Sequence, residues 1–177
     1  MFKRILKLAS LVLGLVVLSS LYGCATGANS GAMSISSVDM PTSANAELKG
    51  KAAVRYVGGG KETNPMLASQ VDSNSFKTAL SQSLRVAGYE SNGVAAFNID
   101  AELQALSQPM FGLTFDVTST VRYTVEGQGK RKIFPITAVG TATTSDAFAA
   151  VERLRIANER SIKENIKKFL NELSLGL

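Results

Sequence analysis

The chain of 177 residues contains no histidine and no tryptophan, and its only cysteine is Cys24. The absence of histidine excludes histidine-based catalytic triads, His–carboxylate metal sites and imidazole proton shuttles. A single cysteine excludes an intrachain disulfide bond and a cysteine-rich zinc site. The acidic residues show neither catalytic pairing nor metal-ligand spacing, and nothing marks a lysine base for a serine nucleophile. We therefore expect a protein that is not an enzyme and that has no metal site and no cofactor.

A glycine-rich run, Gly58-Gly59-Gly60-Lys61, invites comparison with phosphate-binding loops. The P-loop pattern needs a further glycine ahead of Gly-Lys-Ser/Thr and a helix that starts at once. Here Lys61 is followed by Glu62 and a polar stretch, and the next helical pattern begins more than ten residues later. The run therefore predicts a flexible loop and not a phosphate site.

The first residues have the pattern of an export signal. Three basic residues without any acid precede 14 uncharged positions, Leu8–Leu21, rich in leucine and valine; the basic residues are Lys3, Arg4 and Lys7. These are the n-region and h-region of a secretory signal. Because a membrane-spanning helix needs about 20 apolar residues, a permanent anchor helix is the less favoured alternative.

The signal ends in Leu21-Tyr22-Gly23-Cys24, which resembles the bacterial lipobox, the motif cut by signal peptidase II before a cysteine that is then lipidated. Leu21, Gly23 and Cys24 match the pattern, whereas Tyr22 stands where a small residue is commoner. A small-residue site for ordinary signal peptidase is the alternative, but it leaves the only thiol of the chain unexplained.

The lipobox resemblance implies a membrane anchor of two or three acyl chains on Cys24. One acyl chain binds a membrane marginally, whereas two or more hold stably. In the enteric sorting pattern, Ala25 in place of aspartate implies the outer membrane, with the protein facing the periplasm, for a Gram-negative source. Loss of residues 1–23 would leave 16 basic and 14 acidic residues, so the net charge of +5 would fall to +2. That balance does not support nucleic-acid binding.

The remaining chain divides into residues 24–48, a lipidated N-terminus and tether, and residues 49–177, a single α+β domain. Alanine, serine, threonine and glycine dominate Ala25–Leu48, which predicts a flexible tether with a reach of about 25–30 Å. A short edge strand is an alternative within this segment, on the apolar residues Met33, Ile35, Val38 and Met40.

Alternating and helical periodicities follow from Lys49 onward. They predict, in order, a strand at Ala52–Val57, a helix from about Asp72 to Gly88, strands at Phe97–Ala105, Leu113–Glu126 and Ile133–Thr143, and a helix at Ala147–Leu173. Ser119 interrupts an apolar strand face, which suggests a closely crossing helix. Pro135 favours an edge strand.

Particular side chains are assigned by the same patterns. Leu113 falls on an apolar strand face and Phe148 on the apolar stripe of the last helix. Ser145 or Asp146 is the expected cap of that helix, and Glu159 is expected on its outer surface.

The order β-α-β-β-β-α predicts an α+β two-layer sandwich with a mainly antiparallel four-stranded sheet and two helices on one face. The other face of the sheet, lined by threonine and charged residues, is left toward water or a partner. Together with the lipobox, this layout resembles the YajG-type outer-membrane lipoproteins, and its topology is similar to that of the lipopolysaccharide-assembly lipoprotein LptE. The first resemblance implies a fold and a cellular location but no biochemical activity. The second implies a β-barrel partner and a lipopolysaccharide contact.

Two surface features are candidate contacts with a partner or a membrane. Met110 and Phe111 lie in a loop between strands, where folding back over the open end of the core is commoner than insertion into a partner or lipid. A basic turn, Lys130-Arg131-Lys132, is able to meet acidic lipid or lipopolysaccharide phosphates, but such clusters are more often solvated turns that discourage edge pairing. Insertion of the hairpin Leu113–Thr143 into a membrane is a minor alternative.

These observations favour a membrane-anchored, periplasm-facing protein that acts as a non-catalytic binding or assembly subunit of the cell envelope. Its partners are then the membrane, through Cys24, and an envelope protein. The alternative is a carrier of lipid or a small ligand in a cavity between helices and sheet. The identity of the partner and the oligomeric state stay open.

Overall fold

The computed structural model describes residues 25–41, 43–64 and 69–177. The expected signal peptide and the lipobox residues Leu21, Tyr22, Gly23 and Cys24 lie outside these described residues. The elements, in chain order, are α2 (Ser30–Met33), the 3-10 helix η1 (Ser37–Asp39), β1 (Ala52–Gly58), α3 (Ser73–Val86), β2 (Phe97–Ser107), β3 (Phe115–Gly127), β4 (Lys130–Ala142) and α4 (Ala150–Ser174).

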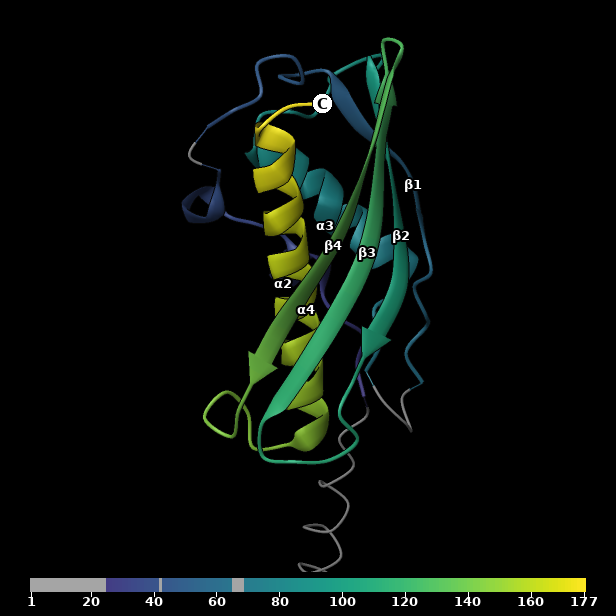
Figure 1. Cartoon of the computed structure of the whole chain (residues 1–177). Coiled ribbons are helices and arrows are strands. Elements are labelled where there is room, and N and C mark those ends of the chain that lie inside the picture. Colours follow the sequence, from purple (N-terminus) through teal and green to yellow (C-terminus); the bar gives the residue numbers. More distant parts are fainter. Residues whose placement is uncertain (1–24, 42, 65–68) are drawn as a thin grey trace, which may run out of the picture.

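The four strands form one mixed sheet in the order β1-β2-β3-β4, and α3 and α4 lie on one of its faces (Figure 1). The strands β1 and β2 are parallel because α3 connects them, and the other two pairs are antiparallel. This confirms the expected α+β fold and the order of its main elements. The strand β4 lies at an edge of the sheet, as its proline predicts.

The core lies between the sheet and the two long helices. Burial alternates along β3 and β4, as expected for strands with one covered face. The Tyr123 ring stacks on Phe169 of α4 at 4.0 Å between centroids, and its hydroxyl donates to Asn165 at 2.9 Å. Burial raises the pKa of Tyr123. The helix α4 covers the apolar face of the hairpin, and the other face is mainly polar, which does not favour the alternative of a membrane-inserting β-ribbon.

The helix α4 crosses the sheet closely at Ser119, as the break in the apolar pattern predicts. The Ser161 hydroxyl donates to the Ser119 hydroxyl at 2.8 Å, and both side chains are buried. On the neighbouring strand, a Cβ added to Gly140 would lie 2.1 Å from the Ser161 amide nitrogen. Only glycine therefore permits this approach of α4 to β4.

Residues 25–48 differ from the expected tether and from its edge-strand alternative. They contain α2 and η1, and four of their side chains are buried in the main core: Ala28, Met33, Ile35 and Leu48. The segment packs against both α3 and α4, and the Asp39 carboxylate binds Lys163 of α4 at 2.9 Å. The buried apolar side chains and the Asp39–Lys163 ion pair together hold the segment against the two helices.

The start of α4 also differs from the expectation. The helix begins at Ala150, and the Asp146 carboxylate accepts from the Thr143 amide at 2.8 Å, closing a turn instead of capping the helix. Neither Ser145 nor Asp146 is the N-cap, which is Ala149. Phe148 therefore lies outside the helix and is 96% exposed. Glu159, expected on the outer surface, is 5% exposed.

Candidate functional site

The connections that follow β1, β2 and β4 gather at one end of the molecule, opposite the β3–β4 turn (Figure 1). We call this the loop end; its described residues are 59–64, 69–72, 108–114 and 143–149. The described chain also starts here, since the Ala28 amide donates to the Gln70 carbonyl at 3.0 Å. The Gln70 side chain in turn donates to that of Gln108 at 3.0 Å.

Four large apolar side chains stand exposed on the loop end. Their exposed fractions are 91% for Met110, 86% for Phe111, 75% for Leu113 and 96% for Phe148. The commoner expectation, that Met110 and Phe111 fold back over the core, is therefore wrong. Leu113 and Phe148, which their periodicity assigns to the core, are found outside it. No charged residue occurs among residues 108–114, so this part of the surface is both apolar and neutral.

A buried arginine joins the two loops that carry these side chains. Arg153 is 5% exposed and donates to the carbonyls of Ala147 at 3.0 Å and Phe148 at 2.6 Å. The same guanidinium donates to the Gly112 carbonyl at 3.2 Å and lies 5.3 Å from the Phe115 ring centroid. The loops 108–114 and 143–149 are therefore held side by side as one surface. Sequence reasoning missed this, because an arginine at the start of a helix is usually solvated.

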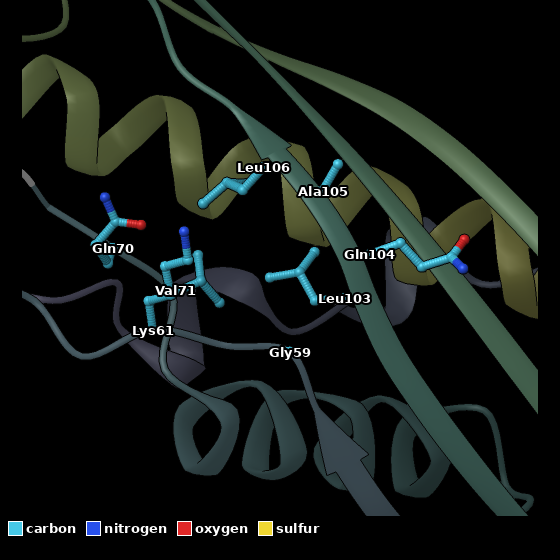
Figure 2. A pocket seen from close by; sticks show the side chains of 8 residues that line it. All are labelled: Gly59, Lys61, Gln70, Val71, Leu103, Gln104, Ala105 and Leu106. Carbon is cyan, nitrogen blue, oxygen red and sulfur yellow. The ribbon is translucent and has the colours of Figure 1, made fainter.

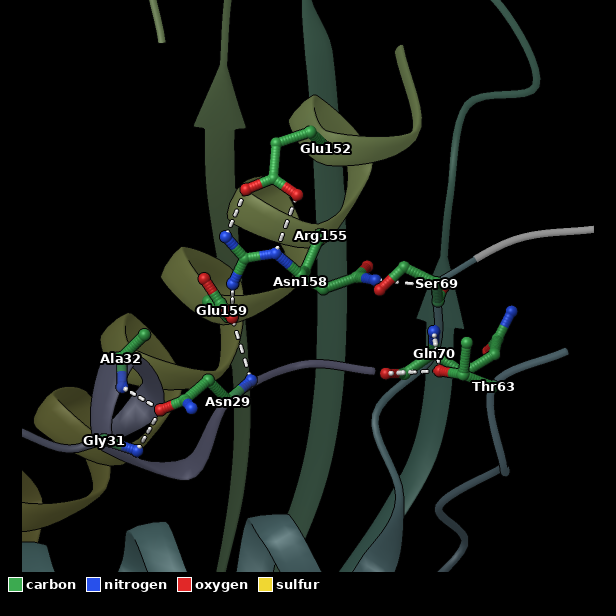
Figure 3. Close-up of polar contacts among 10 residues, drawn as sticks. All are labelled: Asn29, Gly31, Ala32, Thr63, Ser69, Gln70, Glu152, Arg155, Asn158 and Glu159. Atoms are coloured by element: carbon green, nitrogen blue, oxygen red, sulfur yellow. Dashed lines mark hydrogen bonds and ion pairs between the residues drawn. The ribbon is translucent and has the colours of Figure 1, made fainter. Parts of the chain in front are cut away.

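Behind the loop end, a polar network fastens the start of the chain to α4 (Figure 3). The buried Glu159 carboxylate accepts from the Asn29 amide at 2.8 Å and pairs with Arg155. Arg155 also binds Glu152, and this contact lowers the pKa of Glu152. The hydrogen bonds that Arg155 donates to Glu152 raise the pKa of Arg155. The Glu159 carboxylate is thus bonded to both Asn29 and Arg155, and it fixes the position of the described N-terminal residues relative to α4.

Amide side chains extend the network to β2. Asn158 of α4 donates to the Ser69 carbonyl at 3.0 Å and accepts from Gln108 at 2.8 Å. The backbone amide of Gln70 donates to the Thr63 hydroxyl at 2.8 Å, which brings the two ends of the 63–70 connection together (Figure 3). The start of the chain, the end of β2 and α4 are thus one bonded unit.

A pocket of about 80 Å³ lies at the loop end, between Gly59, Lys61, Gln70, Val71 and residues 103–106 of β2 (Figure 2). Ligand pockets for small molecules are commonly about 300–1,000 Å³. This pocket is therefore smaller than a usual small-molecule site and does not support the carrier alternative.

The glycine run of this pocket has a packing role. Gly59 has a φ of 78°, and a Cβ on it would lie 2.1 Å from the Leu103 carbonyl oxygen. A Cβ on Gly60 would lie 2.4 Å from the Ser73 amide nitrogen. The expectation of a flexible loop is therefore wrong: the backbone at Gly59 and Gly60 packs closely against the backbone of Leu103 and Ser73.

The basic turn Lys130-Arg131-Lys132 lies at the opposite end of the molecule, beside the C-terminus (Figure 1). Lys130 pairs with Glu47 at 2.7 Å, and Lys132 donates to the Gly176 carbonyl at 2.8 Å. The helix α4 has 25 residues, a length of about 37 Å at 1.5 Å per residue. The basic turn and the loop end are therefore separated by about the length of α4, so a domain that stands on its loop end holds the basic turn away from the membrane.

Across the described ranges, no three histidine, cysteine, aspartate or glutamate side chains are grouped so that they could hold a metal ion. None of the helices formed by residues 25–177, the gaps excepted, has the length and apolar character of a membrane span.

No family model matches the chain, and no curated protein matches it. Among solved structures, it is similar to a Caulobacter crescentus protein described provisionally as a lipoprotein, with 14% identity and a TM-score of 0.43 over 55% of this chain and 80% of that one. A Xanthomonas campestris protein of family DUF330 has 6% identity and a TM-score of 0.46 over 77% and 94%. The hypothetical protein CT253 of Chlamydia trachomatis has 12% identity and a TM-score of 0.45 over 72% and 94%.

Proposed function

We propose that this protein is a lipid-anchored, non-catalytic subunit of the bacterial cell envelope, fastened to the outer membrane through Cys24 and facing the periplasm. The main observation behind this proposal is the sequence Leu21-Tyr22-Gly23-Cys24, which follows a basic n-region and ends a 14-residue apolar stretch. The anchor would join the domain at its loop end, because the first described residue, Ala25, follows Cys24 directly.

The proposed role as a subunit is supported by the face of the sheet that α3 and α4 leave uncovered, which we call the open face (Figure 1). This face carries polar and charged side chains joined across strands: Arg55 of β1 binds Asp100 of β2 at 2.9 Å and Glu126 of β3 at 3.3 Å. Exposed apolar side chains accompany them, with Tyr56 at 55% and Val139 at 51%. A surface of mixed polarity is typical of contacts between proteins that also exist separately. We therefore assign the binding partner to the proteins of the envelope.

The anchor is tested by metabolic labelling with radioactive palmitate in a Gram-negative host. The wild-type chain should incorporate label and appear in the outer-membrane fraction at the mature mass. The Cys24→Ser variant should accumulate as unlabelled precursor of full length, and an inhibitor of signal peptidase II should produce the same accumulation in the wild type. Thr26→Ser, two residues away, is the matched control and should mature normally. Normal processing and membrane retention of Cys24→Ser would contradict the proposal.

A further inference from the structure

The four exposed apolar side chains of the loop end are not explained by an anchor alone. We infer that Met110, Phe111, Leu113 and Phe148 form a membrane-contact surface that enters the headgroup region of the leaflet holding the lipid anchor, and so sets the orientation of the domain. This inference rests on the proposed anchor at Cys24.

Chain length brings this surface to the membrane. Cys24 lies four residues before Ala28, and four extended residues span at most about 14 Å. Ala28 is bonded to Gln70, which is bonded to Gln108 at the start of the loop that carries Met110 and Phe111. An anchor on Cys24 therefore holds this end of the molecule, and not the basic turn, next to the bilayer.

The fold of residues 25–48 restricts the alternatives. A free tether would let any side of the domain turn toward the lipid. Here the Asn29 amide is bonded to the buried Glu159, and Met33 is fully buried, within nine residues of the anchoring position. The domain is thus unable to swing away on a long linker, and its loop end is the surface that the leaflet meets.

The chemistry of the surface suits a lipid interface. Transfer of two phenylalanines, a methionine and a leucine from water to lipid is favourable. Residues 108–114 contain no charged side chain that would have to lose its hydration. Asp146, the acidic residue of the second loop, is already paired with Arg160 at 2.7 Å. Because several acyl chains retain the protein by themselves, the surface acts on orientation and not on retention.

The absence of tryptophan makes a direct test available. Phe111→Trp and Phe148→Trp each place a single tryptophan on the surface, and Val94→Trp, at a residue that is 101% exposed near the start of β2, is the matched control at the other end. The full acylated protein is reconstituted in vesicles of phosphatidylethanolamine and phosphatidylglycerol that contain phosphatidylcholine brominated on its acyl chains. The side chains at positions 111, 148 and 94 are all exposed, so the substitutions should not disturb the packing of the core.

We expect blue-shifted emission, and quenching by brominated lipid at least about threefold greater for Phe111→Trp and Phe148→Trp than for Val94→Trp, since tryptophan prefers the interface. Intact mass measured on the same samples reports acylation. Acylated protein whose Phe111→Trp and Phe148→Trp signals match Val94→Trp would overturn the membrane-contact surface, assign it to a protein partner and leave the anchor intact. Absence of acyl mass on Cys24 would overturn the anchor and this inference together.

Discussion

The backbone amide of Asn29 donates a 2.8 Å hydrogen bond to the carboxylate of Glu159, which is 5% exposed and lies 130 residues further along the chain. This bond joins the start of the described chain to α4. Glu159→Gln removes the charge that pairs with Arg155 while keeping an acceptor for Asn29. We expect a loss of about 2 kcal/mol in the free energy of unfolding, because Arg155 would lose one buried partner. Urea denaturation measures this loss.

Glu164→Gln is the control for that substitution, since Glu164 is on the same helix and its side chain is 44% exposed. Its effect should stay within about 0.5 kcal/mol. Limited proteolysis supplies a second measurement, because the hydrogen bond from Asn29 to a neutral amide is weaker than the bond to a carboxylate and should allow faster cleavage within residues 25–48 in Glu159→Gln alone. Equal stability and equal cleavage of the two variants would show that the contact does not hold the segment.

Loss of the Arg153 side chain should separate the two apolar loops. Arg153→Ala leaves the carbonyls of Gly112, Ala147 and Phe148 without their shared donor. We expect a destabilisation of about 2–3 kcal/mol and an increase in amide hydrogen exchange that is largest at residues 108–114 and 143–149. Arg131→Ala, an exposed arginine of the basic turn, is the control and should change neither quantity. Uniformly faster exchange across the whole domain would instead indicate a general loss of stability.

Gly140→Ala should disrupt the close crossing of α4 and β4. The added Cβ would lie 2.1 Å from the Ser161 amide nitrogen and 2.4 Å from the Ala157 carbonyl oxygen, and both are backbone atoms that a rotamer change cannot move. We expect a destabilisation of about 2–3 kcal/mol, measured by thermal or urea unfolding. Gly93→Ala has open space around its Cβ and should be nearly neutral. Equal stability of the two variants would contradict the packing described for this crossing.

The ion pair between Asp39 and Lys163 should make part of the stability depend on pH. Hydrogen bonds from Lys163 and Ser36 hold the pKa of Asp39 well below its usual range. A depressed carboxyl pKa stabilises the fold above the unfolded value of about 4, and this contribution is lost as the pH falls toward the folded value. Asp39→Asn should therefore cost about 0.5–1 kcal/mol at pH 7 and less at pH 3.

A double-mutant cycle with Lys163→Met isolates this contribution. In the Lys163→Met background, Asp39→Asn should have a smaller effect at pH 7, because the main hydrogen-bond donor is already absent. Urea unfolding of the four proteins at both pH values measures the coupling. An Asp39→Asn effect that is the same at pH 3 and pH 7 would show that Asp39 does not contribute through its charge.

The long strands and helices were predictable because one face of each is covered and the other is wet. In β4, Phe134, Ile136 and Ala138 alternate with exposed residues, and this period of two is visible in the sequence. The α2 segment was not predictable in the same way. The one buried side chain of this four-residue helix, Met33, follows a serine, a glycine and an alanine, and the helix depends on the Asn29 cap and on contacts with α3 and α4.

The candidate site was only half visible for a similar reason. Met110 and Phe111 interrupt a polar stretch and attract attention, whereas Leu113 and Phe148 sit next to regular elements and extend their periodicities by one step. Periodicity does not show where an element ends. Here β3 begins at Phe115 and α4 at Ala150, so both side chains fall outside and face the solvent.

The packing of residues 25–48 has a mechanical consequence. If the proposed anchor at Cys24 holds the domain and a partner pulls on the open sheet face, the force would enter at Cys24 and reach the described fold at Ala28, four residues later. It then acts along α4, in shear, on the Asn29–Glu159 bond and the buried Met33. There is no slack chain to extend first. Tension between the membrane and the partner would therefore be felt directly by the hydrophobic core.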